Sequence, residues 1–156
     1  MIEEGNKIPE GIIRHKDESG IKEISTQDYF SDKKVIMFGL PGAFTGTCSQ
    51  KHLPSFISHS DEIQAKGYSI ACLAVNDPHV MKAWGDLSNV GGKIDMLSDS
   101  DCSISKSLGL DKDFGAVLGH RCKRYAMIID NSVITKIFVD ESGFNLSSAE
   151  NVLQSL

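Results

Sequence analysis

The chain has 156 residues, of which 40% are hydrophobic and 24% are charged, and its net charge is −5 at neutral pH. These values are typical of a soluble protein with a single globular domain, residues 1–156, and they exclude a disordered chain. The sequence has no cluster of basic residues that could bind phosphates, its acidic N-terminus has no apolar signal-peptide core, and no apolar stretch is as long as a membrane span. Neither nucleic acid nor a membrane is therefore expected as a partner.

The first half of the chain predicts a hairpin followed by two central strands. Residues 12–16 and 21–24 flank the turn-forming segment Asp17–Gly20 and predict an N-terminal β-hairpin that precedes the main sheet. Residues 34–39 and 68–75 are short, nearly continuous apolar runs, which are typical of strands covered on both faces. We expect these two strands to be central and parallel.

A helix is expected between those two strands, from about Thr47 to Lys66. Pro54 lies inside it, lacks a backbone donor and crowds the carbonyl of Gln50, so a kink or break is expected there. After the second strand, Asp77 can cap a helix whose first residue is a proline, which predicts a helix from 78 to about 86.

The pattern then predicts a short strand at 94–97 and a further helix. Residues 98–101 supply capping side chains for this helix, which runs to about Leu108 and ends at Gly109. A polar loop is expected from there to His120.

The C-terminal part predicts two strands and a helix. Residues 124–129 and 133–139 flank a hairpin turn at 130–132, and Ser147 with Glu150 forms a capping box for the last helix. The whole order of elements predicts an α/β protein with a thioredoxin-like fold, in which helices flank a central mixed sheet.

The cysteines are four in number: Cys48, Cys72, Cys102 and Cys122. None forms a C-x-x-C pair, which excludes the dithiol oxidoreductase motif and the usual zinc-knuckle spacing. Free thiols in a reducing compartment are therefore expected, and we interpret the protein as cytoplasmic.

Cys48 lies in the first turn of the helix that follows the strand at 34–39. Unpaired N–H groups and the positive end of the helix dipole favour the thiolate over the thiol at this position. No acidic residue between Asp32 and Asp61 opposes the ionisation. The dipole alone leaves too little thiolate at neutral pH, so a fixed cation is needed, and an arginine from elsewhere in the fold is the natural candidate.

The spacing Pro41-x-x-x-Thr45-x-x-Cys48 resembles the active-site pattern of the peroxiredoxins, and the chain resembles their type-5 subfamily. Similar stretches cover most of the chain in order: Phe44–Ser49 with His52–Pro54, Ala71–Asp77, Val80–Gly85 and Lys123–Ala126. The resemblance implies a thiol-dependent peroxidase that reduces hydrogen peroxide and alkyl hydroperoxides through a sulfenic acid. It implies no cofactor and no metal ion, and it suggests a homodimer formed through the active-site edge.

The resemblance also assigns roles to five residues. Cys48 matches the peroxidatic cysteine, while Thr45 and Pro41 match residues that position the substrate. Arg124 matches the arginine that supplies the missing cation. The N–H groups of Thr47 and Cys48 would join Arg124 in stabilising the charge that develops on the peroxide.

Regeneration of Cys48 needs another thiol. Residues 143–148 contain no cysteine where relatives with an internal disulfide carry the resolving one, so the resemblance implies a one-cysteine mechanism with glutathione, glutaredoxin or thioredoxin as reductant. Cys72 lies in an apolar run and is interpreted as core packing. Cys102 lies beside acidic residues and is interpreted as silent. Cys122 would share a strand face with Arg124 and is the best internal candidate for a resolving cysteine.

Other interpretations stay open at this point. The same reactive cysteine could serve a non-catalytic redox sensor, and His52, four residues after Cys48, could make it a cysteine hydrolase. Without an orienting partner, His52 is more simply structural or on the pocket rim. Thr45 could only cap the helix, and Pro41 could only end the strand.

Overall fold

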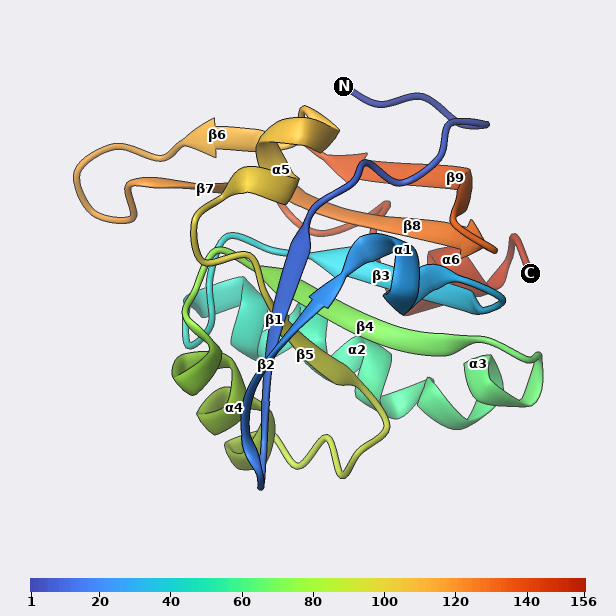
Figure 1. The fold of residues 1–156 in the computed structure, drawn as a ribbon, viewed down its shortest axis with the longest axis horizontal. Helices are drawn as coiled ribbons and strands as arrows, with labels where there is room; N and C mark the ends of the chain where they lie inside the picture. Colours follow the sequence, from blue (N-terminus) through green and yellow to red (C-terminus); the bar gives the residue numbers. More distant parts are fainter.

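The computed structural model describes residues 1–156 and contains two β-sheets (Figure 1). The strands are β1 (Ile12–Asp17), β2 (Gly20–Ser25), β3 (Lys34–Gly39), β4 (Ser69–Ala74), β5 (Asp95–Ser98), β6 (Asp111–Asp113), β7 (His120–Cys122), β8 (Arg124–Asp130) and β9 (Val133–Asp140). The main sheet has seven strands in the order β2-β1-β5-β4-β3-β8-β9, and β6 with β7 forms the small second sheet.

The main sheet is mixed. Strand β3 pairs in parallel with β4, and β4 pairs in parallel with β5, whereas β8 runs antiparallel to both β3 and β9. The two apolar runs near the middle of the sequence are therefore the central parallel pair, as predicted. The fold is thioredoxin-like.

The helices are short. They are α1 (Thr26–Phe30), the π-helix η1 (Cys48–His52), α2 (Leu53–Ser58), α3 (Ser60–Ala65), α4 (Pro78–Leu87), α5 (Ser103–Leu108) and α6 (Ala149–Leu153). The longest, α4, has 10 residues. None of them combines the length and the apolar character that crossing a bilayer requires.

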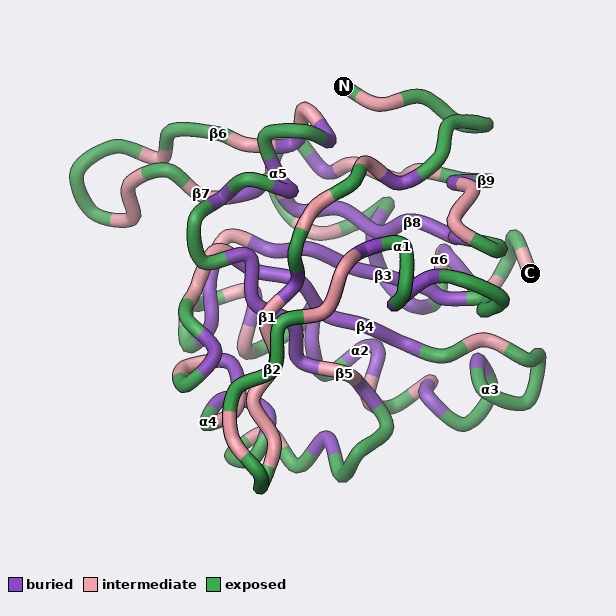
Figure 2. The backbone as a smooth tube through the Cα atoms, in the orientation of Figure 1, coloured by how far each residue is buried: buried purple, intermediate pink, exposed green.

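Side chains of the central strands alternate between two hydrophobic cores, one on each face of the sheet. On β3, Ile36 and Phe38 belong to the core that α2, α3, α4 and α6 cover, while Val35 and Met37 belong to the core that α1 and α5 cover. Figure 2 shows β3, β4 and β8 buried along nearly their whole length. This burial on both faces explains why their sequences read as continuous apolar runs.

The expected helix from Thr47 to Lys66 is interrupted twice. The N–H of Leu53 donates to the carbonyl of Cys48, five residues back, so the chain forms a π-turn immediately before Pro54 and an α-helix after it. A second break, which was not predicted, lies at His59, whose backbone leaves the helical region. The proline thus starts a regular segment rather than ending one, since the first turn of a helix needs no donor from it.

Other differences concern short elements. The predicted N-terminal hairpin is confirmed as β1 and β2, and β1 also joins the edge of the main sheet through the pair Arg14 and Ser98. Helix α1 was not predicted, and the stretch expected to be a loop up to His120 contains β6 and most of the turn toward β7, which projects from the body in Figure 1. These elements are three to five residues long, too short for a periodic pattern to reveal.

Candidate active site

Cys48 lies where the chain leaves β3 and enters the π-turn. Cys48 is only 1% exposed and belongs to the same hydrophobic core as Phe38 and Leu53. The wide π-turn places Cys48 and His52 so that both contact one residue of β8, Arg124. Such turns are uncommon and frequently mark functional sites.

The pairing of β3 with β8 explains how a distant arginine reaches this cysteine. Gly39, at the end of β3, lies opposite Tyr125, so Arg124 stands beside the point where the chain turns toward η1. Nη2 of Arg124 donates to Sγ of Cys48 at 3.0 Å. Arg124 is itself only 8% exposed, so solvent screens this charge weakly. The structure therefore brings together the thiol and the cation that the sequence placed 76 residues apart.

His52 holds the arginine from the other side. Nη1 of Arg124 donates to Nδ1 of His52 at 2.8 Å, so Nε2 carries the ring hydrogen and donates to the carbonyl of Ser147 at 3.1 Å. Burial, and next the charge of Arg124, lower the pKa of His52 to about 3. The imidazole is neutral and its only lone pair is occupied, so it does not act as a base toward Cys48. The sequence lacked an orienting partner for His52, and the tertiary structure supplies two.

Asp140 anchors the loop that carries Ser147. Its carboxylate accepts four hydrogen bonds, from the N–H groups of Asn145, Leu146 and Ser147 and from the hydroxyl of Ser147, at 2.7 to 3.0 Å. Burial opposes ionisation, but these bonds outweigh it, so the pKa of Asp140 lies below its usual range. Because Asp140 takes the hydroxyl of Ser147, the cap of α6 is Ser148, and the predicted capping box at Ser147 is wrong by one residue.

The segment before Cys48 is held by both its own and distant groups. The hydroxyl of Thr45 donates to the carbonyl of Gly42 at 2.7 Å, so it makes no hydrogen bond to the sulfur and keeps its lone pairs available. The carbonyl of Thr45 accepts from Ser49 in the first helical turn. Arg121 donates to the carbonyl of Pro41 at 3.2 Å and to that of Leu118 at 2.9 Å. Arg121 thus ties the β6–β7 loop to the segment before Cys48.

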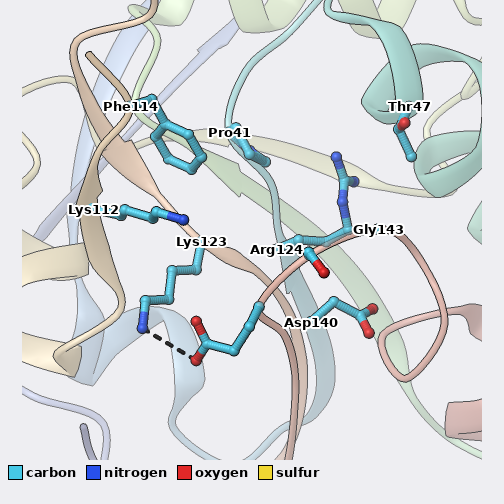
Figure 3. Close-up of a pocket in the computed structure, with 10 residues that line it drawn as sticks. Pro41, Thr47, Lys112, Phe114, Lys123, Arg124, Asp140 and Gly143 are labelled. Atoms are coloured by element: carbon cyan, nitrogen blue, oxygen red, sulfur yellow. Dashed lines mark hydrogen bonds and ion pairs between the residues drawn. The ribbon is translucent and has the colours of Figure 1, made fainter.

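A cavity of about 200 Å³ opens beside Arg124 (Figure 3). Pro41 and Thr47 line it together with the guanidinium, so three of the residues predicted for the site meet there. Its remaining lining is mostly polar: Lys112, Phe114, Lys123, Asp140, Glu141, Ser142 and Gly143. Cys48 and Thr45 are not among the lining residues, so the cavity gives a small molecule access to the arginine that contacts Cys48 and not to the sulfur itself.

The other cysteines lie away from this cavity. Burial raises the pKa of Cys72, on β4, and raises that of Cys122 to about 12. Cys122 packs in the core on the opposite face of the sheet from Cys48, and its thiol donates to the carbonyl of Leu40 at 3.1 Å. The expected shared face with Arg124 is wrong, because Cys122 ends β7, Arg124 begins β8, and Lys123 between them belongs to neither strand.

Cys102 precedes α5 and is also buried. Burial, and next the charge of Asp99, raise its pKa. All four cysteines are free thiols in the structure. No group of three or more His, Cys, Asp or Glu side chains is gathered in a way that could hold a metal ion.

The sheet is thioredoxin-like, and a cysteine at the start of a helix accepts a hydrogen bond from an arginine on a neighbouring strand. This fold and this site define a thiol-dependent redox protein. The family model described as Redoxin matches residues 3–153. Peroxiredoxin-2D of Arabidopsis thaliana is 40% identical over 158 aligned residues, which cover 97% of this chain and 96% of that protein.

Solved structures agree with this match. Reduced Prx3 of Vibrio vulnificus in complex with H2O2 is 42% identical and superimposes with a TM-score of 0.96 over 99% of both chains. Peroxiredoxin 5 of Alvinella pompejana is 32% identical, with a TM-score of 0.88 over 99% of this chain and 97% of its own. The chain belongs to the peroxiredoxin family, whose members are thiol-dependent peroxidases.

Proposed function

We propose that this protein is a peroxiredoxin of the type-5 subfamily that reduces hydrogen peroxide and alkyl hydroperoxides with Cys48 as the peroxidatic cysteine. The observation that carries the proposal is the 3.0 Å contact between Arg124 and the sulfur of Cys48, next to an open cavity. The relative from Vibrio vulnificus, solved with H2O2, supports hydrogen peroxide as a substrate.

In the proposed reaction the thiolate of Cys48 attacks one oxygen of the peroxide in line with the O–O bond. A sulfur–oxygen bond forms, the O–O bond breaks, and the leaving oxygen takes a proton to become water or an alcohol. Arg124 and the N–H groups of Thr47 and Cys48 stabilise the negative charge that moves from sulfur to oxygen. No further oxidant or reductant enters this step.

Thr45 and Pro41 position the peroxide in this scheme. The hydroxyl of Thr45 already donates to Gly42, so the role left to its oxygen is to accept a hydrogen bond from the peroxide. Pro41 lines the cavity and has no N–H, so it closes one wall without competing for the substrate. Arg121 fixes this wall through the carbonyl of Pro41.

We further propose that the sulfenic acid of Cys48 is reduced by an external thiol, either glutathione with glutaredoxin or thioredoxin, in a one-cysteine mechanism. Burial and raised pKa values make Cys72 and Cys122 poor attacking thiols. Four free thiols also fit the reducing, cytoplasmic location proposed for the protein.

A homodimer through the active-site edge is part of the same proposal. Val117 is 94% exposed, more than any other large apolar residue of the chain, and Phe44 is 53% exposed. They belong to the two segments that Arg121 ties together, the loop before Cys48 and the β6–β7 loop. Sedimentation of the wild type and of Val117→Glu tests this part, and a monomeric wild type would overturn it.

Peroxide turnover tests the main proposal. With dithiothreitol as the reductant, the wild type should consume many equivalents of hydrogen peroxide, while Cys48→Ser should consume peroxide only at the background rate. Cys102→Ser is the matched control and should keep turning over. A wild type that consumes one equivalent and then stops would indicate a redox sensor instead of an enzyme.

A further inference from the structure

The mouth of the cavity beside Arg124 carries charged side chains that the reaction with peroxide does not use. Lys112 comes from β6, and Lys123 joins β7 to β8; in Figure 3 the ammonium group of Lys112 lies near Phe114, whereas that of Lys123 points toward the carboxylate it pairs with. A peroxide is small and uncharged, so it has no need of these two lysines. They point to a second, larger and charged ligand of the same site.

The charges of this mouth do not cancel. Asp140 directs its carboxylate to the loop at 145–147, and Glu141 pairs with Lys123 at 3.3 Å. Lys112 has no carboxylate partner, and its ammonium lies 5.2 Å from the centre of the Phe114 ring. Lys112 is therefore free to pair with a bound anion. Lys123 could contact the same anion while it keeps its ion pair with Glu141.

The lining also restricts the kind of ligand. Phe114 is its only hydrophobic side chain apart from Pro41, so the cavity is unsuited to a long acyl chain. Two ammonium groups suit carboxylates, and Glu141 suits an ammonium group. A small zwitterionic molecule with free carboxylates fits this arrangement better than a fatty-acid hydroperoxide does.

We propose that this mouth binds the carboxylates of a small zwitterionic thiol such as glutathione, with Lys112 as the main cation, and that it thereby delivers the reductant to oxidised Cys48. This inference rests on the proposed peroxidase function. The thiol sulfur attacks the sulfenic sulfur of Cys48, an S–S bond forms, the S–O bond breaks, and the oxygen leaves as water. A second thiol then attacks the mixed disulfide, which releases the thiol of Cys48 and the disulfide of the reductant.

The kinetic test compares two reductants on the same enzyme. We expect the ratio of kcat/KM for glutathione to kcat/KM for dithiothreitol to fall in Lys112→Ala by up to about fivefold, the upper end of what one solvent-exposed charge contact contributes. Lys112→Arg should restore most of the ratio. Lys66→Ala removes an exposed lysine at the end of α3, on the far side in Figure 1, and should leave the ratio unchanged.

A binding measurement tests the site without turnover. S-methylglutathione, which cannot react, should bind the reduced wild type in calorimetry, more weakly at 0.5 M than at 0.05 M salt, and Lys112→Ala should bind it about fivefold more weakly. No binding to the wild type, or equal binding to both proteins, would overturn the proposal.

The remaining outcomes separate this inference from the proposed function. If dithiothreitol supports turnover but glutathione does not, the reductant site is wrong and the peroxidase stands. If Lys112→Ala loses activity toward linoleic acid hydroperoxide, and not toward the neutral cumene hydroperoxide, the mouth recognises an anionic peroxide and the proposal is overturned. If neither thiol supports turnover, the proposed function itself fails.

Discussion

Cys48 and Cys122 show how two almost fully buried thiols in one protein acquire opposite character. They are 1% and 0% exposed and pack on opposite faces of the same sheet. The sulfur of Cys48 accepts a hydrogen bond from a guanidinium, whereas the thiol of Cys122 donates one to a carbonyl. Burial by itself favours the neutral thiol, so the partner decides. The guanidinium of Arg124 stabilises a negative charge on Cys48 and so favours a nucleophile, whereas the carbonyl of Leu40 stabilises the neutral thiol of Cys122, which only packs in the core.

Removing the guanidinium of Arg124 should have the largest effect, because Cys48 would then be a buried thiol without a cation, like Cys122. In Arg124→Ala, the second-order rate constant for hydrogen peroxide should fall about 100- to 1,000-fold, the usual loss for one preorganised charge-stabilising donor. Alkylation of Cys48 by iodoacetamide at pH 7 should also slow, because the guanidinium at 3.0 Å from the sulfur is gone. Stopped-flow mixing and mass-resolved alkylation measure these effects.

Arg14→Ala is the control for that variant, because its guanidinium pairs with Glu23 on the β1–β2 hairpin, away from the site. An unchanged alkylation rate at pH 7 in Arg124→Ala would show that the arginine only supports the structure.

His52 offers the next largest effect. In His52→Phe, Arg124 loses the acceptor at 2.8 Å that orients it, and we expect the peroxide rate constant to fall at least about tenfold. His52 also predicts a pH dependence of stability. Its pKa is about 3 in the folded state and about 6.5 when unfolded, so below pH 6.5 only the unfolded chain takes up this proton.

The free energy of unfolding should therefore decrease as the pH falls from about 6.5 toward 3, by at most about 1.4 kcal/mol per pH unit from this group. Urea titrations of the wild type and His52→Phe between pH 7 and pH 5 measure the difference. Parallel pH dependences in the two proteins would contradict the buried, neutral state of His52.

Asp140 acts further from the sulfur, and its effect should be mainly on stability. Asp140→Asn weakens the four hydrogen bonds that hold the loop of Ser147, and should cost about 2 kcal/mol at pH 7. The pKa of Asp140 is lowered in the folded state, so its contribution is present above about pH 4 and is lost as the pH falls further. The stability gap between wild type and variant should then narrow below pH 4.

Asp113→Asn is the matched control, since Asp113 lies on the exposed strand β6 and accepts one local bond from Gly115. An equal loss of stability in both variants would argue against a special role for Asp140.

Replacing Cys122 should have the smallest effect on catalysis, and it tests whether this cysteine is inert. Cys122→Ala should keep the peroxide rate constant within about twofold, and should lower the free energy of unfolding by about 1 kcal/mol because a buried sulfur and its hydrogen bond are lost. Turnover assays and urea titration measure both. A loss of turnover with glutathione or dithiothreitol would mean that Cys122 resolves the sulfenic acid after all.

The sequence predicted the fold well where one residue and its neighbours decide the structure. Apolar runs marked β3 and β4, Gly109 ended α5 with a φ of 68°, and Asn131 and Ser132 formed the turn between β8 and β9. The prediction failed for α1, β6 and β7, which are short and stabilised by neighbouring segments. It also missed the π-turn at Cys48, because no local pattern distinguishes a π-turn from an α-helical one.

From the sequence alone it was determined that a cysteine opens the helix after the first central strand, at a set distance from Pro41 and Thr45. Only the tertiary structure decided what that cysteine meets. Pairing of Gly39 with Tyr125 places Arg124 against the sulfur, and the loop held by Asp140 places a carbonyl against His52. These contacts join residues 72 to 95 positions apart, and their geometry is set by strand register and loop closure, which no local periodicity encodes.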